Sequence, residues 1–117
     1  MRIFTYGSLL DDSIRSRVLN KSVDGHIDTL KGYKLSNHTV LPYPTIIPFK
    51  GGTVYGKVFD VTSEDLEKLD RYETQYYTKI NVLLDSGKES LVYIDSSTTI
   101  ADGEVWYAKG VAARLDE

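Results

Sequence analysis

The carboxylate that stands out in this sequence is Glu73, at the end of a helix expected over residues 63–73. At about 100° per residue, Glu73 falls between Leu66 and Leu69, on the face that the leucines direct toward the core. Burying a carboxylate is costly, and desolvation raises its pKa toward neutrality, which suits a general acid or base. We therefore identify Glu73 as a candidate proton carrier. The alternative is that the helix end frays and Glu73 turns out to water.

A second candidate is the segment Tyr-Gly-Ser-Leu at residues 6–9. A strand expected over residues 2–6 ends at Gly7, and a helix expected over residues 11–19 begins shortly afterwards. Such a loop can direct several backbone N–H groups at one point, and the N-terminus of a helix favours an anion there. The alternative is an ordinary turn between a strand and a helix.

The cysteine, histidine and tyrosine content limits the kinds of catalytic and metal-binding site that the chain can form. The chain has no cysteine, which excludes disulfides, thiolate metal sites and cysteine nucleophiles. Its two histidines, His26 and His38, do not form a metal-ligand pattern, so we expect both to be structural and expect no metal or other cofactor. Most of the nine tyrosines are expected to be packing or surface residues on strands, but Tyr76 and Tyr77 follow Glu73 closely and are better candidates for a site.

Composition limits the class of protein. The 117 residues are 41% hydrophobic and 26% charged, which is typical of a soluble globular domain. A net charge of −3 argues against a nucleic-acid partner. No apolar run approaches the roughly 20 residues of a membrane helix, and residues 1–6 lack the features of a signal peptide. We expect a cytoplasmic protein with no membrane partner; its oligomeric state is not indicated.

The elements that must position these residues are short. Many short strands with two or three helices predict an α+β fold with a mostly antiparallel sheet or small barrel, in a single domain over residues 1–117. The three prolines predict a structured loop with a short extended piece at residues 45–47, and the glycines at 51 and 52 predict a turn. Further strands are expected over residues 25–30, 33–37, 53–61, 77–84 and 90–94, and a short terminal helix or irregular cap over residues 104–115.

Taken in order, these motifs resemble the γ-glutamylcyclotransferase-like family, also called AIG2-like. The resemblance covers residues 2 to about 107, and the chain departs from the family pattern at Thr74, Lys79 and Val105. The similar motifs are Tyr-Gly-Ser-Leu at 6–9, the proline-rich loop at 43–48, the strand V-x-G-x-V-F-x-V at 54–61, Leu-Asp-x-Tyr-Glu at 69–73, Tyr77 with Lys79, and the acidic residue and tryptophan at 104–106.

The resemblance implies a small mixed β-barrel with flanking helices and a cavity at one end. It also implies a reaction in which a γ-glutamyl compound closes to 5-oxoproline and releases an amine, with its own α-amine as nucleophile and no need for a metal. Glu73 would carry the proton in this reaction. The substrate-binding residues implied by the resemblance are Tyr6, Gly7, Ser8, Leu9 and Tyr77.

Several alternatives stay open. One is a non-catalytic small-molecule binding protein of the same fold, and another is an enzyme acting on γ-glutamyl amines, isopeptide remnants or a glutamyl-protected intermediate. A barrel that binds nucleic acid is the weakest, because lysines and arginines are not clustered. The amides of residues 7–9 would hold either the reacting carbonyl oxygen or the substrate's α-carboxylate, and the amine half of the substrate is not identified.

Overall fold

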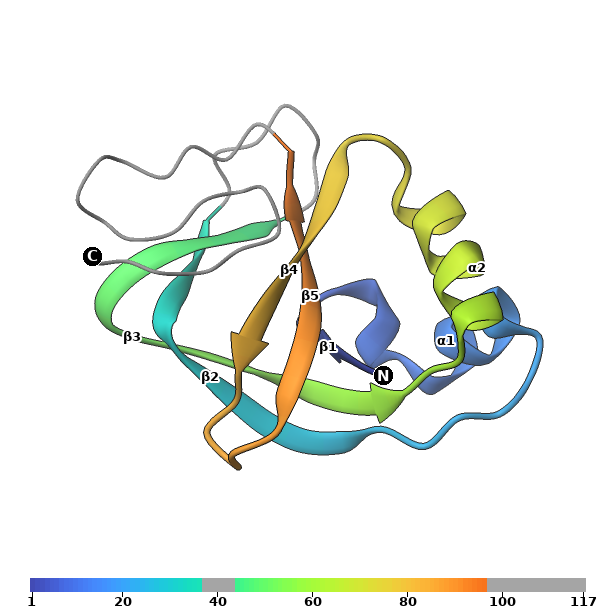
Figure 1. Ribbon diagram of the computed structural model, residues 1–117, viewed down its shortest axis with the longest axis horizontal. Coiled ribbons are helices and arrows are strands. Elements are labelled where there is room, and N and C mark those ends of the chain that lie inside the picture. Colours follow the sequence, from blue (N-terminus) through green and yellow to red (C-terminus); the bar gives the residue numbers. More distant parts are fainter. Residues whose placement is uncertain (37–43, 97–117) are drawn as a thin grey trace.

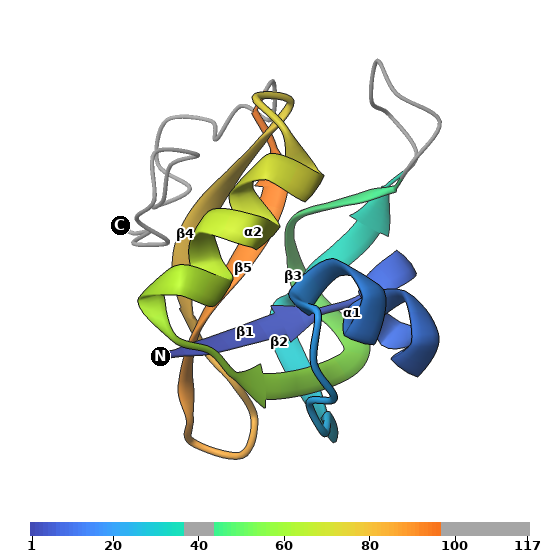
Figure 2. The same cartoon turned by 90° about the vertical axis from the view of Figure 1, so that its right-hand side faces the viewer.

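The structure is a computed structural model that describes residues 1–36 and 44–96. Two helices lie together beside one curved sheet (Figures 1 and 2). In chain order the elements are β1 (Arg2–Thr5), the 3-10 turn η1 (Ser8–Leu10), α1 (Asp12–Leu19), β2 (His26–Ser36), β3 (Thr45–Asp60), α2 (Ser63–Glu73), β4 (Tyr77–Leu83) and β5 (Glu89–Asp95).

The short strand β1 lies at the centre of the sheet, whose order is β2-β3-β1-β5-β4. It pairs antiparallel with β3, with Ile3 opposite Phe59, and parallel with β5, with Ile3 opposite Leu91. The pairs β2–β3 and β4–β5 are antiparallel. The predicted α+β class, with a mixed sheet and flanking helices, is therefore confirmed. The chain that follows β1 emerges from the middle of the sheet, which places residues 6–9 among the other strands.

Successive side chains of β1 belong to two hydrophobic clusters on opposite faces of the sheet. Phe4 belongs to the cluster enclosed by the curved sheet, with Val58 of β3 and Val92 of β5. Ile3 belongs to the cluster that contacts the helices, with Leu19 of α1 and Leu69 of α2. Because successive side chains of a strand point to opposite faces, one four-residue strand anchors both halves of the core.

Hydrogen bonds near both ends of the curved sheet join segments that are not neighbouring strands. Near one end, the backbone N–H of Asp85, after β4, donates to the carbonyl of Thr29 in β2 at 2.8 Å. The amide and hydroxyl of Ser86 donate to the Asp28 carboxylate. Near the other end, the N–H of Asp95 donates to Thr45 Oγ1 at 2.8 Å. In the described residues β2 and β4 share no ladder, so these bonds hold the rolled sheet together.

Two of the strand boundaries expected from the sequence are wrong. The strands expected over 25–30 and 33–37 form one strand, β2, with a shift in register beside Gly32, whose φ is +90°. The extended piece at 45–47 and the strand at 53–61 form one strand, β3, that runs through Pro48 and Gly51. Pro48 is tolerated because it pairs with Tyr33 at a level where β3 lies beyond the end of β1 and has one partner strand. The terminal helix expected over 104–115 and His38 lie outside the described residues.

Gly56 allows β1 and β3 to approach closely. A Cβ atom at this position would overlap the carbonyl oxygen of Thr5 and lie 2.8 Å from Cζ of Phe4. A side chain here would push β1 out of register with its neighbours. The glycine of the strand motif at 54–61 therefore determines where residues 6–9 begin.

Arg15 fixes the C-terminal end of the segment at residues 6–9. It is 2% exposed, and its guanidinium donates from Nη1 to the carbonyl of Leu9 at 2.8 Å and from Nε to the carbonyl of Val23 at 2.9 Å. Its Nη2 pairs with the carboxylate of Asp12, and its Cζ lies 5.5 Å from the ring centroid of Phe59. A buried charge with these partners fixes the backbone of residue 9 against α1. Among the described residues, no helix is long and apolar enough to cross a membrane.

We predict that Arg15→Met lowers the free energy of unfolding by about 2–4 kcal/mol, because the carbonyls of Leu9 and Val23 lose their donors inside the protein. Urea unfolding followed by circular dichroism measures the loss. Arg17→Met is the matched control, since Arg17 is exposed on the same helix, and we expect it to change stability by less than about 0.5 kcal/mol. Equal losses in the two variants would contradict this role for Arg15.

Candidate active site

The helix α2 is held firmly at both ends, and this places Glu73. At its start, Thr62 and Asp65 form a reciprocal capping box, and the Asp65 carboxylate lies 2.9 Å from Nζ of Lys21. Leu69, in the middle, is fully buried against the sheet. The helix ends at Glu73, because Thr74 has a φ of +66° that does not continue an α-helix. Capping and burial therefore set both the length and the rotation of this helix.

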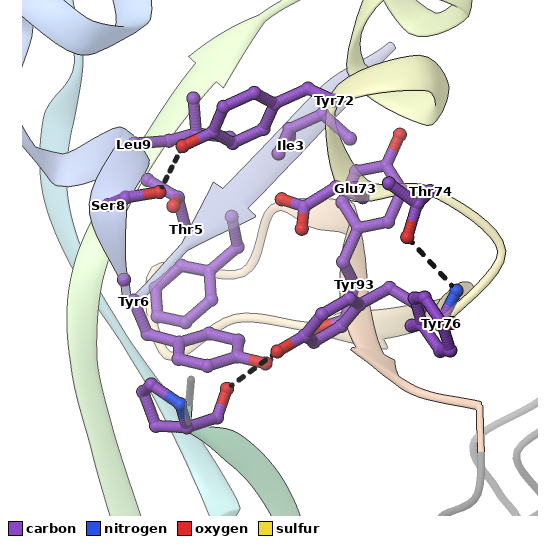
Figure 3. Close-up of a pocket in the computed structure, with 14 residues that line it drawn as sticks. Ile3, Thr5, Tyr6, Ser8, Leu9, Tyr72, Glu73, Thr74, Tyr76 and Tyr93 are labelled. Atoms are coloured by element: carbon purple, nitrogen blue, oxygen red, sulfur yellow. Dashed lines mark hydrogen bonds between the residues drawn. The ribbon is translucent and has the colours of Figure 1, made fainter. Parts of the chain in front are cut away.

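The end of α2 opens on a cavity of about 370 Å³ between the helix and the segment after β1. Figure 3 shows Glu73 pointing from the helix toward this segment. The structure brings all six site residues predicted from the sequence to this one cavity, and their roles in substrate binding and catalysis remain predictions. The lining residues are Ile3, Phe4, Thr5, Tyr6, Gly7, Ser8, Leu9, Pro44, Tyr72, Glu73, Thr74, Tyr76, Tyr77 and Tyr93.

The Glu73 carboxylate is half-buried and forms no hydrogen bond or ion pair with the residues that the structure describes. Burial raises its pKa from an ordinary 4.5 to about 7. Among residues 1–36 and 44–96, no cation or hydrogen-bond donor offsets this desolvation, so the protonated and ionised forms have similar free energies near neutral pH. A carboxyl group in this state can both accept and return a proton.

Three phenols surround Glu73, and each donates its proton away from it. Tyr6 Oη donates to the carbonyl of Tyr93 at 2.7 Å, and Tyr77 Oη donates to the carbonyl of Pro44 at 3.4 Å. Tyr93 Oη donates to Asp70 Oδ1 at 2.6 Å. Burial is the main cause that raises the pKa values of Tyr6 and Tyr93 above their ordinary value, so both stay protonated at neutral pH. These rings form a rigid, uncharged wall.

A hydrogen bond links the segment 6–9 to α2: Ser8 Oγ and Tyr72 Oη lie 2.7 Å apart (Figure 3). The φ of Gly7 is −128°, which does not require glycine, but a Cβ there would meet nothing within 4 Å. The absence of a side chain at Gly7 therefore keeps the cavity wall open.

The backbone of this segment offers free donors. The carbonyls of Gly7 and Ser8 accept from the N–H groups of Leu10 and Asp11, at 2.9 and 3.1 Å. Within residues 1–36 and 44–96, the N–H groups of Gly7, Ser8 and Leu9 donate to no other group. Such groups are ordinarily satisfied by water or by a ligand. Gly7, Ser8 and Leu9 line the same cavity as Glu73, so a negatively charged oxygen bound there could use these donors.

Sequence reasoning missed Tyr72 and Tyr93 as site residues. Tyr72 lies on the edge of the apolar stripe and directly precedes Glu73, which is the signal that could have identified it. Tyr93 sits on an alternating strand and nothing in its neighbours distinguishes it from a core residue. His26 is exposed at the start of β2 and does not line the cavity. In the described part of the chain, no three histidine, aspartate or glutamate side chains gather where they could hold a metal ion.

We predict that Glu73→Gln stabilises the protein above pH 7. The folded state binds the Glu73 proton more tightly than the unfolded state, so the stability of the wild type falls as pH rises from about 4.5 to 7. A neutral glutamine does not lose stability in this way. We therefore expect the free energy of unfolding of Glu73→Gln to exceed that of the wild type by about 1–3 kcal/mol at pH 8 and to equal it at pH 4. Urea unfolding across this pH range measures the difference. Glu67→Gln, on the exposed face of α2, is the control and should show no pH-dependent gain.

The sequence and the fold are similar to those of several other proteins. The chain is 37% identical to AIG2-like protein D of Arabidopsis thaliana over 93 residues, which are 76% of this chain and 61% of that protein. A solution structure from Arabidopsis thaliana superposes with a TM-score of 0.71 at 28% identity, over 80% of this chain and 61% of the other. A structure of a gamma-glutamyl cyclotransferase superposes with a TM-score of 0.63 at 25% identity, over 80% of this chain and 65% of that one.

The chain therefore spans about three fifths of the length of these relatives. Residues 3–111, nearly the whole chain, match the family described as "Gamma-glutamyl cyclotransferase, AIG2-like". The cavity described above lies within the matched range. The protein belongs to the AIG2-like gamma-glutamyl cyclotransferase family.

Proposed function

We propose that the protein converts a γ-glutamyl amine or γ-glutamyl amino acid into 5-oxoproline and the free amine, with Glu73 as the general acid–base residue. The observation that carries this proposal is the half-buried Glu73 carboxyl, with a pKa of about 7 and no partner among the described residues, in one cavity with the unpaired amides of residues 7–9. Membership of the family and the likeness to a gamma-glutamyl cyclotransferase support it.

The reaction needs a base for the substrate's α-ammonium and an acid for the departing nitrogen, and one carboxyl group serves as both. Ionised Glu73 takes a proton from the substrate's α-ammonium, and the amine then attacks the γ-carbonyl carbon. The new C–N bond closes a five-membered ring, and the old amide C–N bond breaks. Glu73 returns its proton to the departing nitrogen, which leaves as the amine. The ring nitrogen gives up its second proton to this amine or to water, and the neutral lactam remains. General acid–base catalysis of this kind contributes about 10²–10⁴-fold to a rate.

The cavity contributes by holding the substrate folded. The α-amine must lie against the γ-carbonyl, and a cavity that fixes this conformer replaces a rare encounter in solution. The N–H groups of residues 7–9 would bind a negatively charged oxygen of the glutamyl group, either its α-carboxylate or the oxygen that gains charge as the ring closes. The neutral rings of Tyr6, Tyr77 and Tyr93 exclude water without competing for the proton of Glu73.

The first test is an assay for 5-oxoproline with γ-glutamyl amino acids and γ-glutamyl amines. We expect release by the wild type and a loss of at least about 100-fold in Glu73→Gln, which keeps the shape and removes the proton carrier. The urea unfolding of Glu73→Gln described above is the control that excludes unfolding as the cause. Equal rates in both proteins would refute the mechanism, and no release across the panel would favour a binding role without catalysis.

A second test concerns the contact between Ser8 and Tyr72. We expect Ser8→Ala and Tyr72→Phe each to raise KM several-fold with little change in kcat, because each removes the same link between the substrate segment and α2. The double variant should be no worse than either single variant, since the contact can be lost only once. Additive losses would show that the two hydroxyls act independently.

A further inference from the structure

Asp70 lies one helical turn before Glu73 on α2, where residues three apart are neighbours. Its carboxylate receives three hydrogen bonds. Tyr93 Oη donates to Oδ1 at 2.6 Å, and Lys79 Nζ donates to Oδ1 and Oδ2 at 2.9 and 3.0 Å. Burial works against the charge of Asp70, but the bonds from Tyr93 and Lys79 hold its pKa below the ordinary value. The Asp70 carboxyl is therefore ionised at neutral pH.

Tyr93 separates this ion pair from Glu73. Its ring lines the main cavity with Glu73, and it also lines a smaller cavity of about 220 Å³ with Asp70 and Lys79. The Lys79 ammonium lies 6.0 Å from the centroid of the ring. The same residue accepts the hydrogen bond of Tyr6 through its carbonyl. The orientation of this ring therefore depends on Asp70, and one wall of the Glu73 site depends on the ring.

The charges of the pair act on Glu73 in opposite directions. A lone carboxylate one turn away would disfavour ionised Glu73, and a lone ammonium at the same place would favour it. Because the two charges are in contact, their effects on the ionisation of Glu73 nearly cancel. In agreement with this, burial alone accounts for the raised pKa of Glu73.

We propose that Asp70 and Lys79 are a pair of positioning residues, which fix the Tyr93 ring beside Glu73 and keep the net charge there near zero. Burial in the cavity then sets the proton affinity of Glu73. The catalytic meaning of this pair rests on the proposed cyclotransferase function, but its effect on Glu73 does not. Within the described part of the chain, Asp70 lies one turn before Glu73 on α2 and is paired with Lys79 of β4. The other ionisable groups that line the cavity with Glu73 are Tyr6, Tyr72, Tyr76, Tyr77 and Tyr93.

The experiment is a titration of the Glu73 side-chain carboxyl carbon by NMR in four proteins. We expect Asp70→Asn to lower the pKa of Glu73 by about half a unit to one unit, because the Lys79 charge is left uncompensated. Lys79→Gln should raise it by a similar amount, because the Asp70 charge is left uncompensated. The double variant should return within about 0.2 units of the wild type. The size is modest because the Asp70 and Lys79 side chains are 48% and 29% exposed.

The substitutions preserve hydrogen bonding as far as possible. Asparagine keeps an oxygen for Tyr93 and Lys79, and glutamine keeps a donor for Asp70. Glu67→Gln removes a carboxylate from the exposed face of the same helix and should leave the Glu73 titration unchanged. Amide spectra of each variant check that the fold is retained.

Shifts of the same sign in both single variants would overturn the proposal, and so would a double variant that does not return toward the wild type. Absence of any shift would overturn it as well. If the protein releases 5-oxoproline, the acidic limb of its pH–rate profile should move with the NMR values. If the NMR values move as expected but no γ-glutamyl substrate is turned over, the pair stands and the proposed reaction fails.

Discussion

The desolvation of one carboxyl group, Glu73, is the constraint around which this protein is arranged. A carboxylate that leaves water without a partner raises the free energy of the folded state, and only a firmly held helix can keep it there. The capping box at Thr62, the buried Leu69 and the contact between Tyr72 and Ser8 all oppose the rotation or fraying that would let Glu73 reach solvent. The polar groups near Glu73 are arranged consistently with this, since the phenols of Tyr6, Tyr77 and Tyr93 donate their protons elsewhere.

The inward position of Glu73 was predictable because the period of a helix is fixed and the two leucines define its buried face. The α+β class and the helix α2 were predictable for the same reason, from periodicity and cap residues. The lengths of the strands β2 and β3 were not predictable from the sequence. Gly32, Gly51 and Pro48 are local signals for turns, and the pairing between two strands of a rolled sheet outweighs them. Tyr93 was not predictable as a site residue, because its importance comes from partners distant in the sequence, Tyr6 and Asp70.

Two departures of this chain from the family pattern acquire a physical meaning in the structure. Thr74 stands where the resemblance leads one to expect glycine, yet its φ is +66° and its ψ is −174°, a region that a β-branched residue enters at a cost of about 1–3 kcal/mol. The strained residue directly follows Glu73, so strain and desolvation are concentrated at the same turn. Lys79 stands where arginine is usual, and a single ammonium suits the compact pairing with one carboxylate that is seen with Asp70.

The hydrogen bond between Tyr6 and Tyr93 joins residues 87 positions apart, and β1 pairs in parallel with β5 across a similar distance in sequence. A polypeptide emerging from the ribosome has therefore made β1 long before the strand that completes its neighbourhood exists. Contacts of this range are slow to form, because the closure of a long loop precedes any gain from pairing. The cavity is thus among the last parts of the protein to assemble, and a ligand that fills it would select chains whose folding is complete.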